Sequence, residues 1–249
     1  MTTGLSYAGT VANTRSYKTQ IATMAVVDET DTNFLEILPM AITYAENRIY
    51  REVDFLFTSI ATTAYSCSIG SRIISVPSGT FVVPEQINII TPSSVSDPDL
   101  GTRNPLTPTT KEFLDAVYGA AGSKGQPLYF APFDDYTFLL GPYPDQTYTV
   151  ELVGTYRPQS LGDGTNGTQT TTFISLYLPD LFIMASMIYV AAYQRNFSSA
   201  QGNDPQMPVT YETQYQALLK SALGEENRKK FEAAAWSSQS ASTSATPTR

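Results

Sequence analysis

The sequence LPDLFIMASMIYVAAYQR at residues 178–195 overlaps the most apolar part of the chain, residues 173–193. Proline at the first helical position and aspartate in the first turn are typical of a helix start, so a helix is predicted to begin near Leu178. It would end near Arg195, which is short of the roughly 20 residues needed to span a bilayer. The stretch therefore predicts a buried central helix rather than a membrane anchor.

Two helices are predicted before this stretch. Tyr17 and Ile21, with Met24, recur at helical spacing and predict a short helix over residues 16–27. A second helix is predicted from Asp31 or Thr32 to Val53, bent or restarted early by Pro39. Its apolar stripe consists of Leu38, Ile42, Ala45, Ile49 and Val53, and its opposite face carries Glu46, Asn47 and Arg51. That face is either solvated or a contact between subunits.

A further helix is predicted from Pro208 onward. Tyr211, Tyr215, Leu218, Leu219 and Ala222 give it an apolar stripe, and Gly224 is expected to break it. The first 13 residues have no periodicity and predict an extended or disordered arm. Eight of the last 13 residues are serine or threonine, which predicts that residues 237–249 form a flexible tail.

The apolar period changes to two between about Phe57 and Leu161. Strands are predicted at residues 61–69, 73–76, 81–91, 128–133, 136–140 and 148–156. A short helix capped by Thr109 or Thr110 interrupts them, and residues 119–125 read as a flexible link. Several short strands with turns at close spacing predict an antiparallel sandwich or small barrel.

Helices, then strands, then helices give an α+β fold. We predict a helical bundle built from the N- and C-terminal segments, with an inserted antiparallel β-sandwich or barrel domain. The arm and first helices occupy residues 1–56, the inserted β-domain residues 57–161, and the C-terminal helices residues 173–236. A Gly-, Asn- and Thr-rich loop at residues 162–172 connects the last two parts.

Composition excludes several kinds of site. The 249 residues contain no histidine and a single cysteine, Cys67, so His-based triads, His metal ligands and intrachain disulfides are ruled out. Cys67 is expected to be a buried apolar residue of a strand. A net charge of −8 disfavours binding to nucleic-acid phosphates or anionic lipid. Charged residues reach only 15%, and the 16 tyrosines suit surfaces that contact other proteins.

Paired carboxylates are the remaining possibility for catalysis, because two of them can act as acid and base in glycoside hydrolysis. The candidates are Asp134, Asp135, Asp145 and Glu151. The three aspartates fall at predicted turns, where they stabilise the backbone, and Glu151 points out of its strand. We therefore expect no enzyme activity, no cofactor and no metal site.

A series of short motifs follows the predicted elements in order. They are AENRIYRE at 45–52, VPEQI at 83–87, PLT at 105–107, GQPLYF at 125–130, YTFLLGPYPD at 136–145, the strand at 148–161 with its Tyr-Arg-Pro at 156–158, and LPDL at 178–181. In this order and spacing the chain resembles the head-to-tail adaptor, or connector, proteins of short-tailed bacteriophages. The resemblance extends over roughly residues 16–232.

This resemblance implies a structural virion protein of the head–tail junction, or neck. Such adaptors form an oligomeric ring, usually of twelve copies, that joins the portal protein to the tail nozzle protein and surrounds the DNA ejection channel. DNA would pass through without specific binding, and no membrane is involved. With no secretory signal at residues 1–7, the protein is expected to be made in the host cytoplasm and to reside in the virion.

The resemblance also implies which residues meet the neighbours. The C-terminal tail of such proteins reaches the portal, which here designates Trp236, Ser237, Ser238, Gln239, Thr246, Pro247 and Arg249. The β-domain faces the tail nozzle, which designates the turn residues Asp134, Asp135, Tyr143, Pro144 and Asp145. Two alternatives stay open: a Tyr-rich carbohydrate-binding β-module, and another neck or tail-completion protein of the same architecture.

Overall fold

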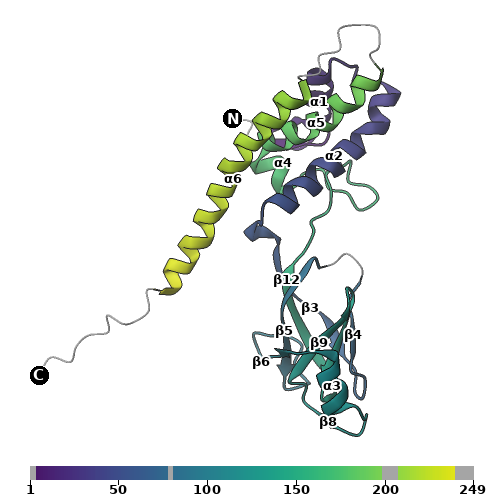
Figure 1. Cartoon of the computed structure of the whole chain (residues 1–249), viewed down its shortest axis with the longest axis vertical. Coiled ribbons are helices and arrows are strands. Elements are labelled where there is room, and N and C mark those ends of the chain that lie inside the picture. Colours follow the sequence, from purple (N-terminus) through teal and green to yellow (C-terminus); the bar gives the residue numbers. More distant parts are fainter. Residues whose placement is uncertain (1–3, 78–80, 198–206, 239–249) are drawn as a thin grey trace, which may run out of the picture. The chain divides into compact units, whose positions relative to one another are not determined.

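The computed structural model describes residues 4–77, 81–197 and 207–238. Contacts divide the chain into two compact units, one made of residues 1–56 and 158–249 and the other of residues 57–157 (Figure 1). The described residues form six α-helices and mainly antiparallel sheets, so the predicted α+β class is confirmed. No sheet closes into a barrel within these ranges.

Helix α5, Pro179–Phe197, lies at the centre of the helical unit. It packs against α1 (Tyr17–Ala25), α2 (Thr32–Glu52) and α6 (Met207–Ser238), as Figure 1 shows. Apolar side chains on α5 are buried among these helices, namely Leu181, Phe182, Ala185, Met187 and Val190. The apolar stretch that predicted a central helix therefore owes its composition to contacts with three neighbouring helices.

Side-chain caps set where the first two helices begin. Ser16 accepts a hydrogen bond from the Thr19 backbone N–H before α1, and Asp31 accepts one from the Phe34 N–H before α2. Both starts agree with the prediction, because a cap satisfies N–H groups that have no partner within the helix. Helix α2 continues through Pro39 without a restart. Its apolar stripe is buried along the whole length, and this packing outweighs one missing hydrogen bond.

One prediction for this unit is wrong, and of the two alternatives for the N-terminal arm the structure shows an extended strand. Helix α6 continues through Gly224, because Tyr215 and Ala222 are buried on one side of that residue and Glu226 on the other. The N-terminal segment is ordered from Gly4 onward: β1 (Gly4–Ser6) pairs in parallel with β2 (Thr14–Ser16). Strand β1 also contacts the short helix α4 (Phe173–Tyr177), so this segment is held by packing that has no periodic signature in the sequence.

The second unit contains two four-stranded sheets. One has the order β3-β12-β5-β6 and is antiparallel; its strands are Ser59–Cys67, Tyr148–Thr155, Val83–Thr91 and Thr102–Pro105. The other has the order β4-β10-β9-β7, with strands Ile73–Ser75, Thr137–Gly141, Tyr129–Asp134 and Thr107–Pro108. Only β7 and β9 run parallel among these described pairs. The observed strands match the main predicted ones within a few residues.

Both sheets contribute to one buried cluster. Ile87, Ile89, Val150 and Leu152 come from the first sheet and Ile74, Phe138 and Leu140 from the second. Cys67 is fully buried in the same cluster, as predicted. Inward residues alternate along each strand, which is the two-residue period that the sequence showed.

Helix α3, Lys111–Tyr118, is capped by Thr110 and covers β9 and β10. Its Leu114 is buried against Ala131 and Leu139. The helix lies so close to Gly141 that an added Cβ there would be 2.5 Å from the Leu114 side chain. The segment predicted as a flexible link is partly structured, because β8 (Lys124–Gly125) pairs in parallel with β11 (Tyr143–Pro144).

Candidate interaction surface

The outer side of α2 forms the wall of a groove in the helical unit. The groove has a volume of about 420 Å³. Seven of its lining residues lie on α2 and one on α5; they are Met40, Thr43, Tyr44, Asn47, Arg48, Arg51, Glu52 and Tyr189. Residues three and four apart on a helix share a face, so the spacing of the sequence alone places Met40, Tyr44, Asn47 and Arg51 on one stripe.

The stripe combines exposed apolar groups with positive charge. Met40 is 56% exposed and Tyr44 is 36% exposed, and the rings of Tyr44 and Tyr189 lie 5.4 Å apart. Arg51 is exposed and forms no ion pair with any residue that the structure describes. A groove of this kind, apolar with a few charges at its margin, is typical of a surface that binds another protein segment.

Arg48 holds one end of the groove in place. Its two terminal nitrogens donate to the Glu212 carboxylate on α6 at 2.7 and 2.6 Å, and Nε donates to Glu52 at 3.2 Å. The guanidinium also lies 4.2 Å from the centre of the Tyr215 ring, whose hydroxyl donates to Glu52 at 2.6 Å. These contacts join α2 to α6, and the two-pronged geometry requires arginine rather than lysine.

The contacts of this cluster shift the pKa values of Arg48, Glu212 and Tyr215. Hydrogen bonding to Glu212 raises the pKa of Arg48, and the same contact lowers the pKa of Glu212. Burial, followed by the bond to Glu52, raises the pKa of the Tyr215 hydroxyl. None of these three shifts moves a pKa toward neutral pH, and the contacts of the cluster hold α2 against α6.

The prediction that Glu46 lies on a solvated or intersubunit face is wrong. Its side chain is buried, accepts a hydrogen bond from the Leu161 backbone N–H at 2.9 Å and another from the Ser160 hydroxyl. Glu46 follows Ile42 by four positions and precedes Ile49 by three, so it shares their inward face. Burial raises the pKa of this carboxyl. It attaches the chain segment before the 162–172 loop to α2.

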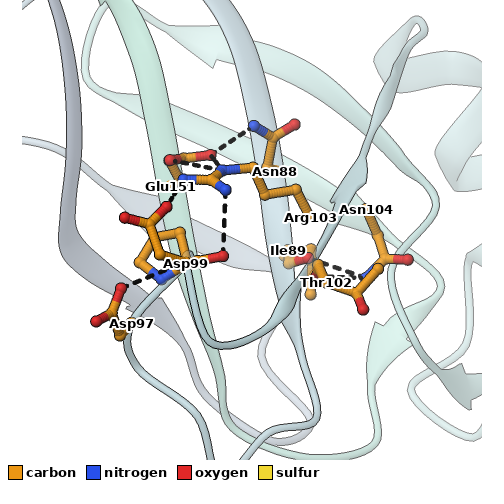
Figure 2. A network of polar contacts seen from close by, with 9 residues as sticks. Asn88, Ile89, Asp97, Asp99, Thr102, Arg103, Asn104 and Glu151 are labelled. Carbon is orange, nitrogen blue, oxygen red and sulfur yellow. Dashed lines mark hydrogen bonds and ion pairs between the residues drawn. The ribbon is translucent and has the colours of Figure 1, made fainter.

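A polar network covers one face of the β3-β12-β5-β6 sheet (Figure 2). The Glu151 carboxylate accepts hydrogen bonds from the Asn88 amide at 2.7 Å and from Arg103 Nε at 3.1 Å. Arg103 also donates to the Asp99 carboxylate at 2.9 Å and to the Pro98 carbonyl at 3.2 Å. Through Arg103 the loop between β5 and β6 is fastened to β12.

The four candidate catalytic carboxylates have structural roles or turn positions. The Glu151 carboxylate accepts hydrogen bonds from Arg103 and Asn88. Asp134 accepts the Tyr136 N–H at 2.7 Å, and Asp145 accepts the Tyr148 hydroxyl at 2.7 Å. Burial, then the contact with Asp145, raises the pKa of Tyr148 to about 12. Among the described residues no three His, Cys, Asp or Glu side chains cluster as metal ligands would.

The turn residues predicted to face a tail component fall into two separate groups. Asp134 and Asp135 precede β10, whereas Tyr143, Pro144 and Asp145 follow it. At about 3.4 Å per residue, the five-residue strand β10 alone places roughly 14 Å between the two groups. The structure therefore does not bring them together.

The residues predicted to bind a portal lie at the end of the chain. Trp236, Ser237 and Ser238 belong to the last turn of α6. Gln239, Thr246, Pro247 and Arg249 lie outside the described residues. The yellow C-terminal end of α6 extends beyond the other helices of its unit in Figure 1.

Comparison with known families decides which kind of protein carries these surfaces. The family model described as SU10 adaptor protein matches residues 15–244, nearly the whole chain. The chain belongs to the SU10 adaptor protein family. The resemblance to bacteriophage head-to-tail adaptors is thereby confirmed at the level of the family. A search of curated proteins finds no match to the chain.

Membership of the SU10 adaptor family identifies a structural adaptor protein of bacteriophages. The family implies contacts with phage portal and tail proteins and a place at the neck of the virion. Within the described ranges, no helix has both the length and the apolarity to cross a membrane.

Sequence reasoning missed the Arg48 cluster of this adaptor. The pair Arg48 and Glu52, four residues apart, was a visible signal for a salt bridge on one helix. The partners Glu212 and Tyr215 lie more than 160 residues further along the chain. Only the packing of α6 reveals them. The Arg103–Glu151 contact, 48 residues apart, was missed for the same reason.

Proposed function

We propose that this chain is the head-to-tail adaptor of its phage, a ring-forming subunit that joins the portal to the tail nozzle and lines the DNA channel. The observation that carries the proposal is the match of the SU10 adaptor family over residues 15–244. In this proposal the helical unit, built from both ends of the chain, is the domain seated against the portal. The β-unit is an inserted domain that faces the tail, and the ring has twelve copies.

The charge and the surface chemistry are consistent with this role. A net charge of −8 per chain would make a ring of copies repel DNA phosphates, so DNA could slide through without binding. Exposed apolar residues such as Met40 and Tyr44 are costly in a lone monomer and are expected at contacts within an assembly. The protein would act by assembly and not by catalysis.

The portal contact is proposed to lie at the C-terminus, from Trp236 to Arg249. A segment rich in serine and threonine that becomes ordered on docking loses conformational entropy, which an aromatic anchor such as Trp236 can offset. The tail-facing contact is proposed at Asp134–Asp135 or at Tyr143–Asp145, which the strand β10 keeps apart.

Mass measurement by light scattering tests the proposal. The full chain is measured alone and after mixing with the portal ring encoded by the same phage. A monomer that joins the portal in a fixed ratio of copies supports the adaptor role. A chain that does not bind the portal but binds glycans on an array supports the carbohydrate-binding alternative. A chain that binds only a different neck protein supports the tail-completion alternative.

A truncated chain tests the contribution of the tail. Deleting Ser237–Arg249 is expected to leave a folded monomer, because the buried residues of α6 precede this segment. It should lose portal binding. A chain in which residues 237–249 are scrambled is the matched control for length and composition. Normal portal binding by the truncated chain would refute the role of the tail and leave the adaptor role intact.

A further inference from the structure

The chain crosses between the two units twice, once after Leu56 and once before Pro158. Each crossing is held to the helical unit by a buried glutamate. Glu226 of α6 accepts the N–H of Leu56 at 3.2 Å, directly before the first crossing. Glu46 of α2 accepts the N–H of Leu161 at 2.9 Å, shortly after the second. The two crossings therefore have the same kind of anchor on two different helices.

Two lysines on the next turn of α6 complete the anchor at the first crossing. Lys229 Nζ donates to the Glu226 carboxylate at 2.7 Å. Lys230 forms an ion pair with Asp54, two residues before Leu56. Residues 226–230 of α6, which we call the α6 strap, thus hold the segment 54–56 that leads toward β3.

The contacts of the α6 strap beyond Glu226 are weak. None of residues 227–231, all of which the structure describes, is buried, and the Phe231 side chain is 74% exposed. The ion pair of Lys230 involves an Asp54 side chain that is 79% exposed. Exposed ion pairs contribute little to stability, because water competes for both charges. The strap can therefore open by local unfolding of the helix end while the rest of the unit stays folded.

The α6 strap depends on the part of the helix that follows it. In an α-helix each N–H donates to the carbonyl four residues earlier, so the N–H groups of residues 231–234 pair with the carbonyls of residues 227–230. Helix formation is cooperative, and fraying of residues 231–238 removes these bonds from the strap. Whatever keeps residues 231–238 helical therefore keeps Glu226 and Lys230 on the first crossing.

We propose that the α6 strap is a conformational device that couples the C-terminal end of α6 to the first crossing into the β-unit. With the strap closed, Leu56 is fixed to α6. With the strap open, Phe55 stays buried in the helical unit and the chain is free from Leu56 onward. A partner that binds the helical form of residues 231–238 closes the strap by mass action, and a closed strap strengthens that binding by the same factor. This inference rests on the proposed function only in naming the portal as that partner.

Hydrogen exchange of two backbone amides in the full chain, without any portal, tests the coupling. Ala234→Gly weakens the helix end, because glycine has a low helix propensity. The Leu56 amide should then exchange about two- to fivefold faster. The Leu161 amide, held by Glu46 of α2, should keep its rate and is the internal control. Val209→Gly, at an exposed position near the start of α6, is the matched control and should change neither amide.

Faster exchange at Leu56 in the Ala234→Gly variant alone supports the strap. An unchanged rate at Leu56 would overturn it. So would an equal acceleration at Leu161 or an equal effect of Val209→Gly, because the helical unit would then be loosened as a whole.

Adding the portal ring separates this inference from the proposed function. Portal binding should slow exchange at Leu56 and leave Leu161 unchanged. Portal binding without this slowing refutes the coupling and leaves the adaptor role in place. A response of Leu56 to Ala234→Gly in a chain that does not bind the portal supports the strap and counts against the adaptor role.

Glu226→Ala gives a second readout that a purely structural role would not produce. It removes the acceptor of the Leu56 N–H and no contact of the β-unit. The rotational correlation time of the β-unit, measured by nitrogen-15 relaxation of amides in its strands, should therefore fall relative to that of the helical unit. Glu212→Ala, which detaches the first half of α6 from Arg48, is the matched control and should leave this ratio unchanged. An unchanged ratio in Glu226→Ala would overturn the proposal.

Discussion

Replacement of Glu46 by glutamine and by alanine separates the charge of this side chain from its hydrogen bonds. Glu46 is 5% exposed and accepts hydrogen bonds from the Leu161 N–H and the Ser160 hydroxyl. Glutamine can still accept from Leu161 with its carbonyl and donate to Ser160 with its amide. Alanine removes both contacts and leaves the buried Leu161 N–H without a partner.

The expected size of the alanine effect follows from these contacts. An unsatisfied buried donor costs about 1–3 kcal/mol, and hydrogen bonds to a charged group contribute about 1.5–3 kcal/mol each. Removing a buried carboxylate offsets part of this loss, because its desolvation is unfavourable. We expect Glu46→Ala to lower the free energy of unfolding by about 2–3 kcal/mol. For a unit of this size that is a fall of roughly 4–12 °C in the melting temperature.

Glu46→Gln should depend on pH in a defined direction. Burial raises the pKa of the folded carboxyl above its ordinary 4.5, so the folded state binds the proton more tightly than the unfolded state. The stabilisation from this proton is complete below the unfolded pKa and is lost as the pH rises through the folded pKa. Glutamine does not titrate, so the melting temperature of the variant minus that of the unmodified chain should become more positive as the pH rises.

Thermal unfolding followed by far-UV circular dichroism from pH 4 to pH 8 provides the measurement, because the helical unit dominates this signal. All other carboxylates are common to the three proteins and cancel in the differences. An alanine variant as stable as the unmodified chain would refute the buried contact. A glutamine variant that loses as much stability as alanine would refute the hydrogen bonds retained by glutamine, and a difference from the unmodified chain that does not rise with pH would refute the raised pKa of Glu46.

Two further substitutions test the packing of each unit. Gly141→Ala places a Cβ 2.5 Å from the Leu114 side chain and should destabilise the β-unit by about 1–3 kcal/mol in urea denaturation, whereas Gly122→Ala, with no atom within 4 Å, should have little effect. Arg48→Lys removes the two-pronged contact with Glu212 and should lower the free energy of unfolding of the helical unit by about 1–2 kcal/mol. Equal stability of Arg48→Lys would show that a point charge suffices there.

Local signals predicted the elements of this adaptor well. Ser16, Asp31 and Thr110 cap helices at the positions expected from the sequence, because each cap bonds an N–H only three residues away. The two-residue period located the main strands of both sheets, since burial of one face imposes it directly. The family resemblance depends on the order of short motifs along the chain, so the amino-acid sequence is sufficient to detect it.

Predictions failed where the partner is distant in the chain. Gly224 was expected to break its helix and does not, because buried neighbours on both sides of it stabilise α6 beyond the cost of one residue. The burial of Glu46 was visible on a helical wheel once Ile42 and Ile49 were known to face inward. Its hydrogen-bond partners, Ser160 and Leu161, could not be predicted from the sequence.

The sequence by itself therefore determined the α+β class, the starts of the main helices, the chief strands and the adaptor family. These rest on hydrogen bonds within four residues, on apolar periodicity and on the order of motifs along the chain. Tertiary structure alone decided that Arg48 joins α2 to α6, that Arg103 fastens a loop to β12, and that the outer side of α2 becomes a groove. The physical reason is that these contacts depend on which surfaces meet across more than 40 residues of chain, and no local propensity specifies that meeting.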